Sequence, residues 1–367
     1  MKIEKPLIPN APLPDSTKLL SYRIIKLIAR GSSSFVYLAE NKQKRLVAIK
    51  EYMPHKLFLR DGSKIDISIS PNDIKEFRRY LRTFFSECRT LALVTHPTIV
   101  RRLDFFRAHN TFYLVTNYEA GSSLRDFLRR RLRQKMGYKK DSLLNAYLIY
   151  RRHKKNMIGP RQIVGERLII KICLDVIAAI SKIHDQDFIY LDLKPDNIYL
   201  RSDGNAFLLD FGATRRTLKK NRKNLNWVYT KGFAAPELLC RQRASLGPWT
   251  DSYSIGATIF ACMCGHSPQS ADQREMKDSV PQSIKLLRKL YSKDLLDLVE
   301  CCLNLNREQR PQNMSVLQER LLACQFDVKP PVKKRLIKNF LVWLKRKRLA
   351  GQSKVANNIL KDHALHR

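Results

Sequence analysis

The hydrophobic pattern of this chain changes once along its length, and that change limits the folds open to it more than any other feature. Up to residue 117, short stretches rich in β-branched and aromatic residues are separated by turn residues, as in β-strands. After Gly121 the apolar residues recur at the spacing of α-helices. The pattern predicts an α+β, bilobal fold, in which a small sheet-rich lobe is followed by a larger helical lobe.

The same two patterns of apolar residues also predict the individual strands and helices. Strands are expected at residues 23–28, 35–40, 46–51, 101–106 and 112–117, and later helices at 166–185, 251–264, 283–290, 293–303 and 314–324. One helix, at about residues 73–94, interrupts the strands. Its apolar side is expected to consist of Phe77, Leu81, Phe84, Phe85, Cys88, Leu91 and Ala92.

The charge of the chain is strongly unbalanced. Lys and Arg number 69 against 33 Asp and Glu, a formal net charge of +36, and segments 129–167 and 329–367 each carry +11. Because 44% of the residues are hydrophobic, the excess indicates a folded protein with basic surfaces and not a disordered chain. We expect an N-terminal extension at 1–20, a first lobe at 21–118, a second lobe at 119–327 with a basic insert at about 129–167, and a basic tail at 328–367.

Neither a signal peptide nor a transmembrane segment is evident, because no apolar run is long enough for one. The eight cysteines lack the paired spacing of zinc sites, which favours buried free thiols and a reducing compartment. We therefore expect a cytoplasmic protein. In the tail, residues 336–344 form a basic amphipathic helix that is expected to dock on its own lobe or a partner, or else to contact an anionic membrane at its inner face.

Four short stretches carry the chemistry and occur in a fixed order. They are VAIK at 47–50, DLKPDN at 192–197, DFG at 210–212 and APE at 235–237. Together they resemble the eukaryotic-like (Hanks-type) serine/threonine protein kinases over residues 22 to about 324, and VAIKEYMP, RDG and HPTIVRRLDFF are most similar to a bacterial branch. The resemblance implies a signalling enzyme that transfers the γ-phosphate of ATP to Ser or Thr hydroxyls of proteins, with an extra loop or hairpin at residues 52–72.

The resemblance assigns the catalytic roles. Lys50 would reach the α and β phosphates of ATP and pair with Glu87, which would otherwise be an unpaired charge among apolar residues. Asp192 would orient the acceptor hydroxyl and take its proton, and Lys194 marks specificity for Ser and Thr. The metal-holding positions would be Asn197 and Asp210, whose hard oxygens suit Mg²⁺, with Mn²⁺ as an alternative. Glu237 and Arg310 match a buried ion pair of the second lobe.

The ATP site would be formed by the phosphate loop, the strands beside it and the hinge between the lobes. Where the family has three glycines, this loop keeps only Gly31, so we expect weaker ATP binding and not its absence. Thr116 would gate the space behind the adenine. The full expected set is Ile28, Ala29, Arg30, Gly31, Ser32, Ser33, Ser34, Phe35, Val36, Ala48, Lys50, Thr116, Asn117, Tyr118 and Glu119.

A second departure affects regulation. Leu191 replaces the family's arginine before the catalytic aspartate, so an activation-loop phosphate could not be read through that residue. Thr230, in the activation and substrate loop, matches the threonine that contacts the catalytic Asp and Lys. The basic run at 215–223 favours acidic acceptor sequences. Two other interpretations stay open: a pseudokinase scaffold, and a module on the same fold that binds polyanions or lipid.

Overall fold

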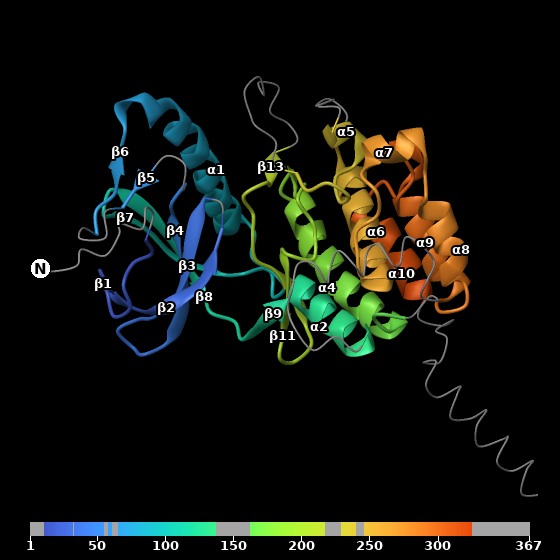
Figure 1. Cartoon of the computed structure of the whole chain (residues 1–367), viewed down its shortest axis with the longest axis horizontal. Helices are drawn as coiled ribbons and strands as arrows, with labels where there is room; N and C mark the ends of the chain where they lie inside the picture. The colour runs from blue at the N-terminus through green and yellow to red at the C-terminus, as the bar shows by residue number, and fades with distance from the viewer. Residues whose placement is uncertain are drawn as a thin grey trace, which may run out of the picture.

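Two lobes joined by a short connection make up the molecule (Figure 1). The computed structural model describes residues 11–31, 33–54, 58–60, 65–136, 162–216, 229–239 and 246–324. Residues 1–10, Ser32, most of the predicted basic insert and activation loop, and the predicted tail lie outside this set. The predicted α+β, bilobal layout is present, with a sheet-rich first lobe and a helical second lobe.

The first lobe is built on one antiparallel sheet with the strand order β1-β2-β3-β4-β8-β7. All five predicted strands are present in it. Its members are β1 (Lys18–Leu19), β2 (Tyr22–Arg30), β3 (Ser34–Glu40), β4 (Leu46–Tyr52), β7 (Arg102–Ala108) and β8 (Thr111–Asn117).

Neighbouring residues of β4 serve opposite faces of this sheet. Lys50 lies between Val36 and Leu114 in the strand register, and Glu51 lies between Phe35 and Tyr113. Because side chains alternate along a strand, Lys50 and Glu51 point in opposite directions. We call the face that carries Lys50 the cleft face and the face that carries Glu51 the outer face.

Helix α1 (Ile74–Leu93) follows a single 3-10 turn, η1 (Pro71–Asp73). Phe84, Cys88 and Leu91 are buried at helical spacing, as predicted. The prediction was wrong for Phe85, which is 40% exposed, and for Ala92, which is also exposed. Each of these two follows a buried residue by one position, which places it about 100° around the helix at the margin of the buried side.

Between β4 and α1 lies a small hairpin, which confirms the extra hairpin predicted at residues 52–72. Strand β5 (Phe58–Leu59) pairs with β6 (Ser68–Ile69), Phe58 opposite Ile69 and Leu59 opposite Ser68. The hairpin stands at the end of the first lobe from which α1 starts (Figure 1). It therefore forms the covalent connection from the strand of Lys50 to the helix of Glu87.

The connection between the lobes runs into β9 (Gly121–Ser123), which pairs with β11 (Ile198–Arg201) in a three-stranded sheet completed by β12 (Ala206–Leu208). Gly121 lies against β11, and a Cβ atom there would stand 2.1 Å from the main-chain oxygen of Leu200. No side chain fits in this position. Strands β10 (Phe188–Ile189) and β13 (Arg215–Arg216) form a separate antiparallel pair.

The other regular elements described in the second lobe are helices. The central one is α6, buried from Thr250 to Met263 and packed against α4, α9 and α10. The predicted helix 283–290 is α8, which starts three residues earlier because Ser279 and Pro281 favour a helix start there. The helices are α2 (Leu124–Met136), α4 (Glu166–His184), α5 (Pro236–Leu239), α6 (Pro248–Cys264), α7 (Ala271–Met276), α8 (Val280–Leu287), α9 (Lys293–Cys302) and α10 (Met314–Ala323), with the 3-10 turn η3 (Arg307–Gln309).

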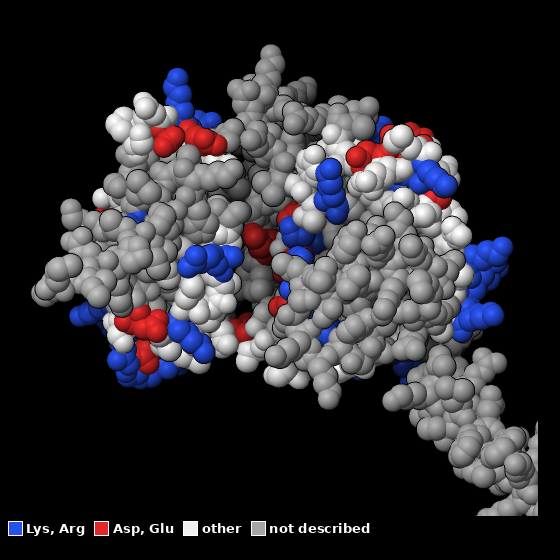
Figure 2. Space-filling model, viewed as in Figure 1, with Lys and Arg blue, Asp and Glu red and all other residues white. Residues whose placement is uncertain are grey.

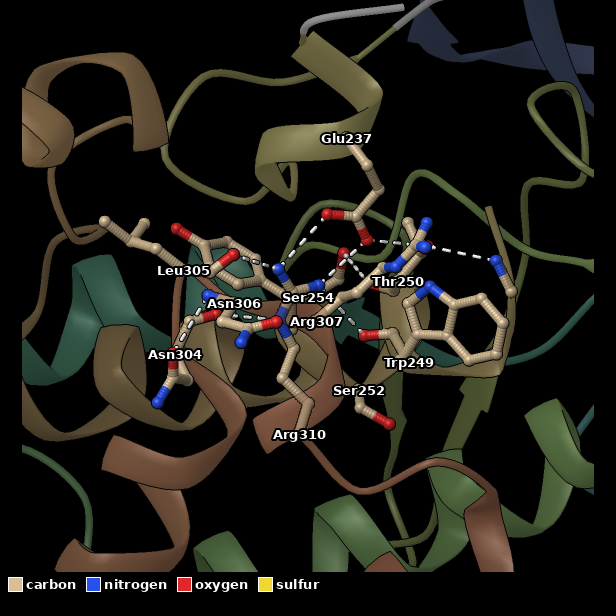
Figure 3. A network of polar contacts seen from close by, with 12 residues as sticks. Glu237, Trp249, Thr250, Ser252, Ser254, Asn304, Leu305, Asn306, Arg307 and Arg310 are labelled. Carbon is tan, nitrogen blue, oxygen red and sulfur yellow. Dashed lines mark hydrogen bonds and ion pairs between the residues drawn. The ribbon is translucent and has the colours of Figure 1, made fainter. Parts of the chain in front are cut away.

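A buried ion pair ties α5 to the segment before α10 (Figure 3). Arg310 donates to both carboxylate oxygens of Glu237, at 2.8 and 3.1 Å. The same guanidinium donates to the main-chain oxygens of Asn304 and Leu305, and the Thr250 hydroxyl donates to Glu237. Since the Arg310 side chain is 0% exposed, these contacts replace the water that it lost on folding.

Candidate active site

Lys50 meets two carboxylates on the cleft face. Its Nζ lies 2.7 and 2.8 Å from the two Glu87 oxygens and 3.4 Å from Asp210 Oδ1. Glu87 comes from the buried side of α1, and Asp210 follows β12 in the second lobe. The structure thus brings together three of the sequence-predicted site residues, one from each of three separate elements.

The charge states of Lys50, Glu87 and Asp210 depend on one another. Burial disfavours the ammonium, but Asp210 and Glu87 raise the pKa of Lys50 above its ordinary value, so Lys50 is cationic. The surrounding lobes desolvate the half-exposed Asp210 in part, but the nearby Lys50 and the Gly212 N–H outweigh this and hold the pKa of Asp210 below its ordinary value. The Asp210 side chain is 49% exposed, so a charged carboxylate at the cleft faces solvent.

Asp192, Lys194 and Thr230 form a closed set of contacts. Lys194 Nζ lies 2.7 Å from both Asp192 Oδ2 and Thr230 Oγ1, and the Thr230 hydroxyl donates to Asp192 Oδ1 at 3.0 Å. Burial raises the pKa of Asp192, while Lys194 and Thr230 oppose that shift. Its raised pKa makes the buried Asp192 carboxylate a better proton acceptor than an ordinary aspartate, as its predicted role requires.

The oxygens expected to hold a metal are suitably presented. The Asn197 amide nitrogen donates to the main-chain oxygen of Asp192 at 2.7 Å and to Asp192 Oδ2 at 3.2 Å. This orientation leaves Asn197 Oδ1 as a neutral oxygen donor, and the second predicted position, Asp210, offers a charged carboxylate. Hard oxygen donors of these two kinds suit Mg²⁺, so the residues present fit the ion.

The predicted catalytic loop, residues 190–197, is held by the central helix α6. Asp251 of α6 accepts hydrogen bonds from the main-chain N–H groups of Tyr190 and Leu191, at 2.9 and 2.8 Å. Leu191 has φ 69°, a left-handed conformation that costs energy for a residue other than glycine. The Tyr190 hydroxyl donates to the main-chain oxygen of Asp210 at 2.6 Å, so the same loop also helps to position Asp210.

The predicted phosphate loop is the turn from β2 to β3. The Gly31 N–H donates to the Ser34 carbonyl at 2.8 Å, and the Met53 N–H donates to the Ser33 carbonyl at 2.8 Å. Val36 shares the cleft face with Lys50, whereas Phe35 lies buried on the outer face, so Phe35 could contribute only its main chain to a nucleotide. Ile28, Ala29 and Arg30, at the end of β2, are exposed.

The predicted gate and hinge lie at the other end of β4 and β8. Thr116 is opposite Ala48 in the register, and both belong to the cleft face. The chain then leaves the sheet, with the Asn117 N–H bonded to the Arg101 carbonyl at 3.1 Å. After Tyr118, Glu119 pairs with Arg201 of β11 at 3.1 Å, which ties the hinge to the second lobe.

Two charged contacts near the site were not predicted. Arg125 of α2 lies 2.5 Å from Asp196 of the catalytic loop. On the outer face, Glu51 is fully buried and pairs with Arg60 of the hairpin. The sequence did carry a sign that Glu51 is buried, because this acid follows an apolar strand and precedes Tyr52 and Met53. Nothing in the sequence identified Arg60 as its partner.

Between the lobes the surface is hollowed, and acidic and basic side chains meet at the bottom of the hollow (Figure 2). Among the described residues no helix is long and apolar enough to cross a membrane. Elsewhere in the described part of the chain, Cys88, Cys173, Cys262, Cys302 and Cys324 are buried.

Comparisons with known proteins agree with this geometry. The model of the protein kinase domain matches residues 22–322. The serine/threonine-protein kinases sck2 of Schizosaccharomyces pombe and SCH9 of Saccharomyces cerevisiae are each 25% identical to this chain, over 78% and 79% of its length. Those alignments span only 38% and 30% of the two relatives. A solved structure, PpkA-294 in its apo form, superposes with a TM-score of 0.66 at 28% identity and covers 84% of this chain and 99% of that one.

Proposed function

Because the chain belongs to the protein kinase family, we propose that it transfers the γ-phosphate of ATP to Ser and Thr hydroxyls of proteins. One observation carries the proposal: Lys50, Glu87 and Asp210 converge on one side of the cleft, and Asp192, Lys194, Thr230 and Asn197 form a contiguous set beside them. A scaffold that had lost catalysis would not need both sets intact.

Each set has its own task in the proposed reaction. Lys50 neutralises charge on the α and β phosphates, while Asn197 and Asp210 would hold Mg²⁺, or Mn²⁺ in its place. The ion supplies charge neutralisation along the phosphates. In the transfer, the acceptor oxygen forms a bond to the γ-phosphorus as the bond to the β,γ-bridging oxygen breaks, and Asp192 takes the hydroxyl proton. Lys194 faces the same carboxylate and stabilises negative charge there.

The direct test measures phosphate transfer from ATP with Mg²⁺ to the protein itself or to a generic protein acceptor. Asp192→Asn and Lys50→Met should each lower the rate by several orders of magnitude. Asp185→Asn is the matched control, since Asp185 forms an exposed pair with Lys182 at the end of α4. Equal activity of Asp192→Asn and the control would contradict the proposal.

A pseudokinase scaffold is the rival supported by the single glycine of the phosphate loop. An active kinase and a scaffold differ in whether bound ATP gives up its γ-phosphate. A scaffold would be stabilised against heat by ATP without any transfer, with either Mg²⁺ or Mn²⁺, and Asp192→Asn would then leave every measured property unchanged.

We further propose that acceptor sequences are acidic and that the basic tail binds polyanions or anionic membranes. The support is electrostatic: the net charge is +36, and α2, which is joined to the catalytic loop through Arg125, also carries exposed Arg129, Arg130 and Arg131. Removal of residues 329–367 should weaken binding to anionic vesicles and leave peptide preference intact. Both effects should fade with salt, and a preference for Arg-rich peptides at low salt would overturn the proposal.

The cytoplasm is the compartment that we propose for this activity. It supplies ATP, and its reducing conditions suit the free cysteines of the described residues.

A further inference from the structure

The segment that joins Lys50 to Glu87 in the sequence is also attached to the sheet from behind. Lys50 and Glu51 are consecutive in β4, and the chain then passes through the β5–β6 hairpin before η1 and α1 begin. An unattached connection of this length would leave the start of α1 free to shift. The hairpin is instead fixed on the outer face, and Arg60 makes the first of two attachments.

Arg60 uses its whole guanidinium in this attachment. Nη2 and Nη1 both donate to the Glu51 carboxylate, Nη1 also donates to the Ala11 carbonyl at 3.1 Å, and Nε donates to the Ile65 carbonyl at 3.1 Å. The Arg60 side chain is 2% exposed and that of Glu51 is 0% exposed. Separating such a pair would leave each charge buried without its partner. Because that state is costly, the pair holds the hairpin and the sheet together.

Glu51 is bound to the sheet as firmly as to the hairpin. The hydroxyl groups of Tyr37 on β3 and Tyr113 on β8 donate to its two oxygens, at 2.6 and 2.7 Å. The Tyr37 hydroxyl also accepts from the Leu13 N–H, so the segment before β1 is part of the same network. One carboxylate thus links three strands of the sheet, the hairpin and the N-terminal segment.

A second attachment lies where the hairpin returns toward α1. The Ile67 N–H donates to the His109 carbonyl, and the Asn110 side chain donates to the Ile67 carbonyl, both at 3.3 Å. β6 ends at Ile69, and η1 begins at Pro71. Little slack remains between this attachment and the first turn of α1.

We propose that Glu51 and Arg60 are positioning residues, which fix the hairpin and thereby hold α1 where Glu87 reaches Lys50. The proposal rests on the proposed kinase activity for its kinetic consequence, but not for its structural one. Tyr52 on the cleft face contacts Phe77 in the first turn of α1 and Phe84 in its middle, and the hairpin adds a second constraint on where the helix begins.

Hydrogen exchange of the full chain tests the structural step without any need for activity. In Arg60→Met, amides of α1 should exchange about tenfold faster, while those of α6 should keep their rates. Arg23→Met is the matched control, because Arg23 pairs with Glu40 on the same sheet and is 57% exposed. Unchanged exchange in α1 would overturn the proposal.

A double-mutant cycle on kcat/KM tests the link to Glu87. Arg60→Met alone should lower kcat/KM for ATP by about 10- to 100-fold, and in the Glu87→Gln background it should change kcat/KM by less than about twofold, because the interaction that it disturbs is already gone. Independent effects that multiply would show a general loss of stability and contradict the proposal. An inactive wild type with faster α1 exchange in Arg60→Met would instead refute only the kinase function.

A milder variant covers the case in which Arg60→Met does not fold. Asn110→Gly removes the side-chain bond to Ile67 and keeps the left-handed backbone of residue 110, at φ 60°. It should speed exchange in the first turns of α1 by a smaller factor and leave α6 unchanged. If neither folded variant alters α1, the hairpin does not position the helix.

Discussion

Two ion pairs in this protein have similar partners and opposite surroundings. Arg310 and Glu237 in the second lobe are 0% and 5% exposed, and further hydrogen bonds from and to neighbouring groups complete their coordination. Lys50 and Glu87 are 20% and 3% exposed, and Lys50 is shared with Asp210, which faces the hollow between the lobes. The enclosed pair suits a structural role, whereas the open pair keeps charge available for a ligand. Mutation should therefore separate activity from stability.

The largest effect on activity should come from a change at the open pair, where Asp210 shares Lys50 with Glu87. Asp210→Ala removes the charged carboxylate that faces the cleft, so we expect phosphate transfer to fall by about 10³-fold or more. The melting temperature should change little, because this side chain is half-exposed. Kinetics and thermal unfolding of the same preparation check both parts, and full activity in Asp210→Ala would place the chemistry elsewhere.

The enclosed pair should respond in the opposite way. Arg310→Met leaves Glu237 buried without its partner, which costs about 3–5 kcal/mol of unfolding free energy. At ~2.1 cal/mol/K per residue for a domain that spans residues 22–322, that corresponds to a fall in melting temperature of roughly 5–8 °C. Arg307→Met, in the adjacent turn, is the control. A stable Arg310→Met protein that had lost activity would reverse the roles assigned to the two pairs.

A smaller effect concerns the acid limb of the pH profile. Burial raises the pKa of Asp192, and the Thr230 hydroxyl, which donates to the ionised carboxylate, opposes that shift. Activity should rise with pH as Asp192 ionises, and Thr230→Val should move this limb to higher pH because it removes a group that favours the charged form. Profiles of kcat/KM for the two proteins check the sign, and a shift to lower pH would contradict it.

The smallest effect is expected at an exposed ion pair, which lies neither in the interior of a lobe nor at the cleft. Arg23 and Glu40 lie at the surface of the first lobe, and Lys44 also reaches Glu40. Water and salt screen such a pair, so Arg23→Met should leave both melting temperature and transfer rate unchanged within measurement error. A clear loss of either would mean that exposure alone does not separate the pairs.

Much of the fold and most of the site residues could be placed from the sequence because their signals are local. Alternating apolar residues marked the strands, and short motifs marked Lys50, Asp192 and Asp210. Glu87 could be chosen because a lone acid on an apolar helix face needs a partner, and the structure puts it within 2.7 Å of Lys50. The catalytic roles of these residues stay predictions until the variants are measured.

Other features depend on contacts that no local pattern encodes. Arg60 lies among turn residues and gave no sign that it would be buried against Glu51. Phe85 was assigned to the apolar side of its helix from its approximate spacing. Its ring is in fact only partly buried, by contacts with Phe105 and Phe112 that the sequence does not reveal. The start of α8 shifted because helix-start residues outweighed the apolar period on which the prediction relied.

The tight approach of Gly121 to β11 has a consequence for how this chain tolerates change. Even a methyl group there would collide with the Leu200 main chain, which cannot rotate away, and with the Tyr199 ring. Position 121 should accept no other amino acid in a saturation library, although it carries no chemistry of its own. Insertions on either side would have to leave this contact in place, so Gly121 is a fixed point at which the connection from the first lobe enters the second.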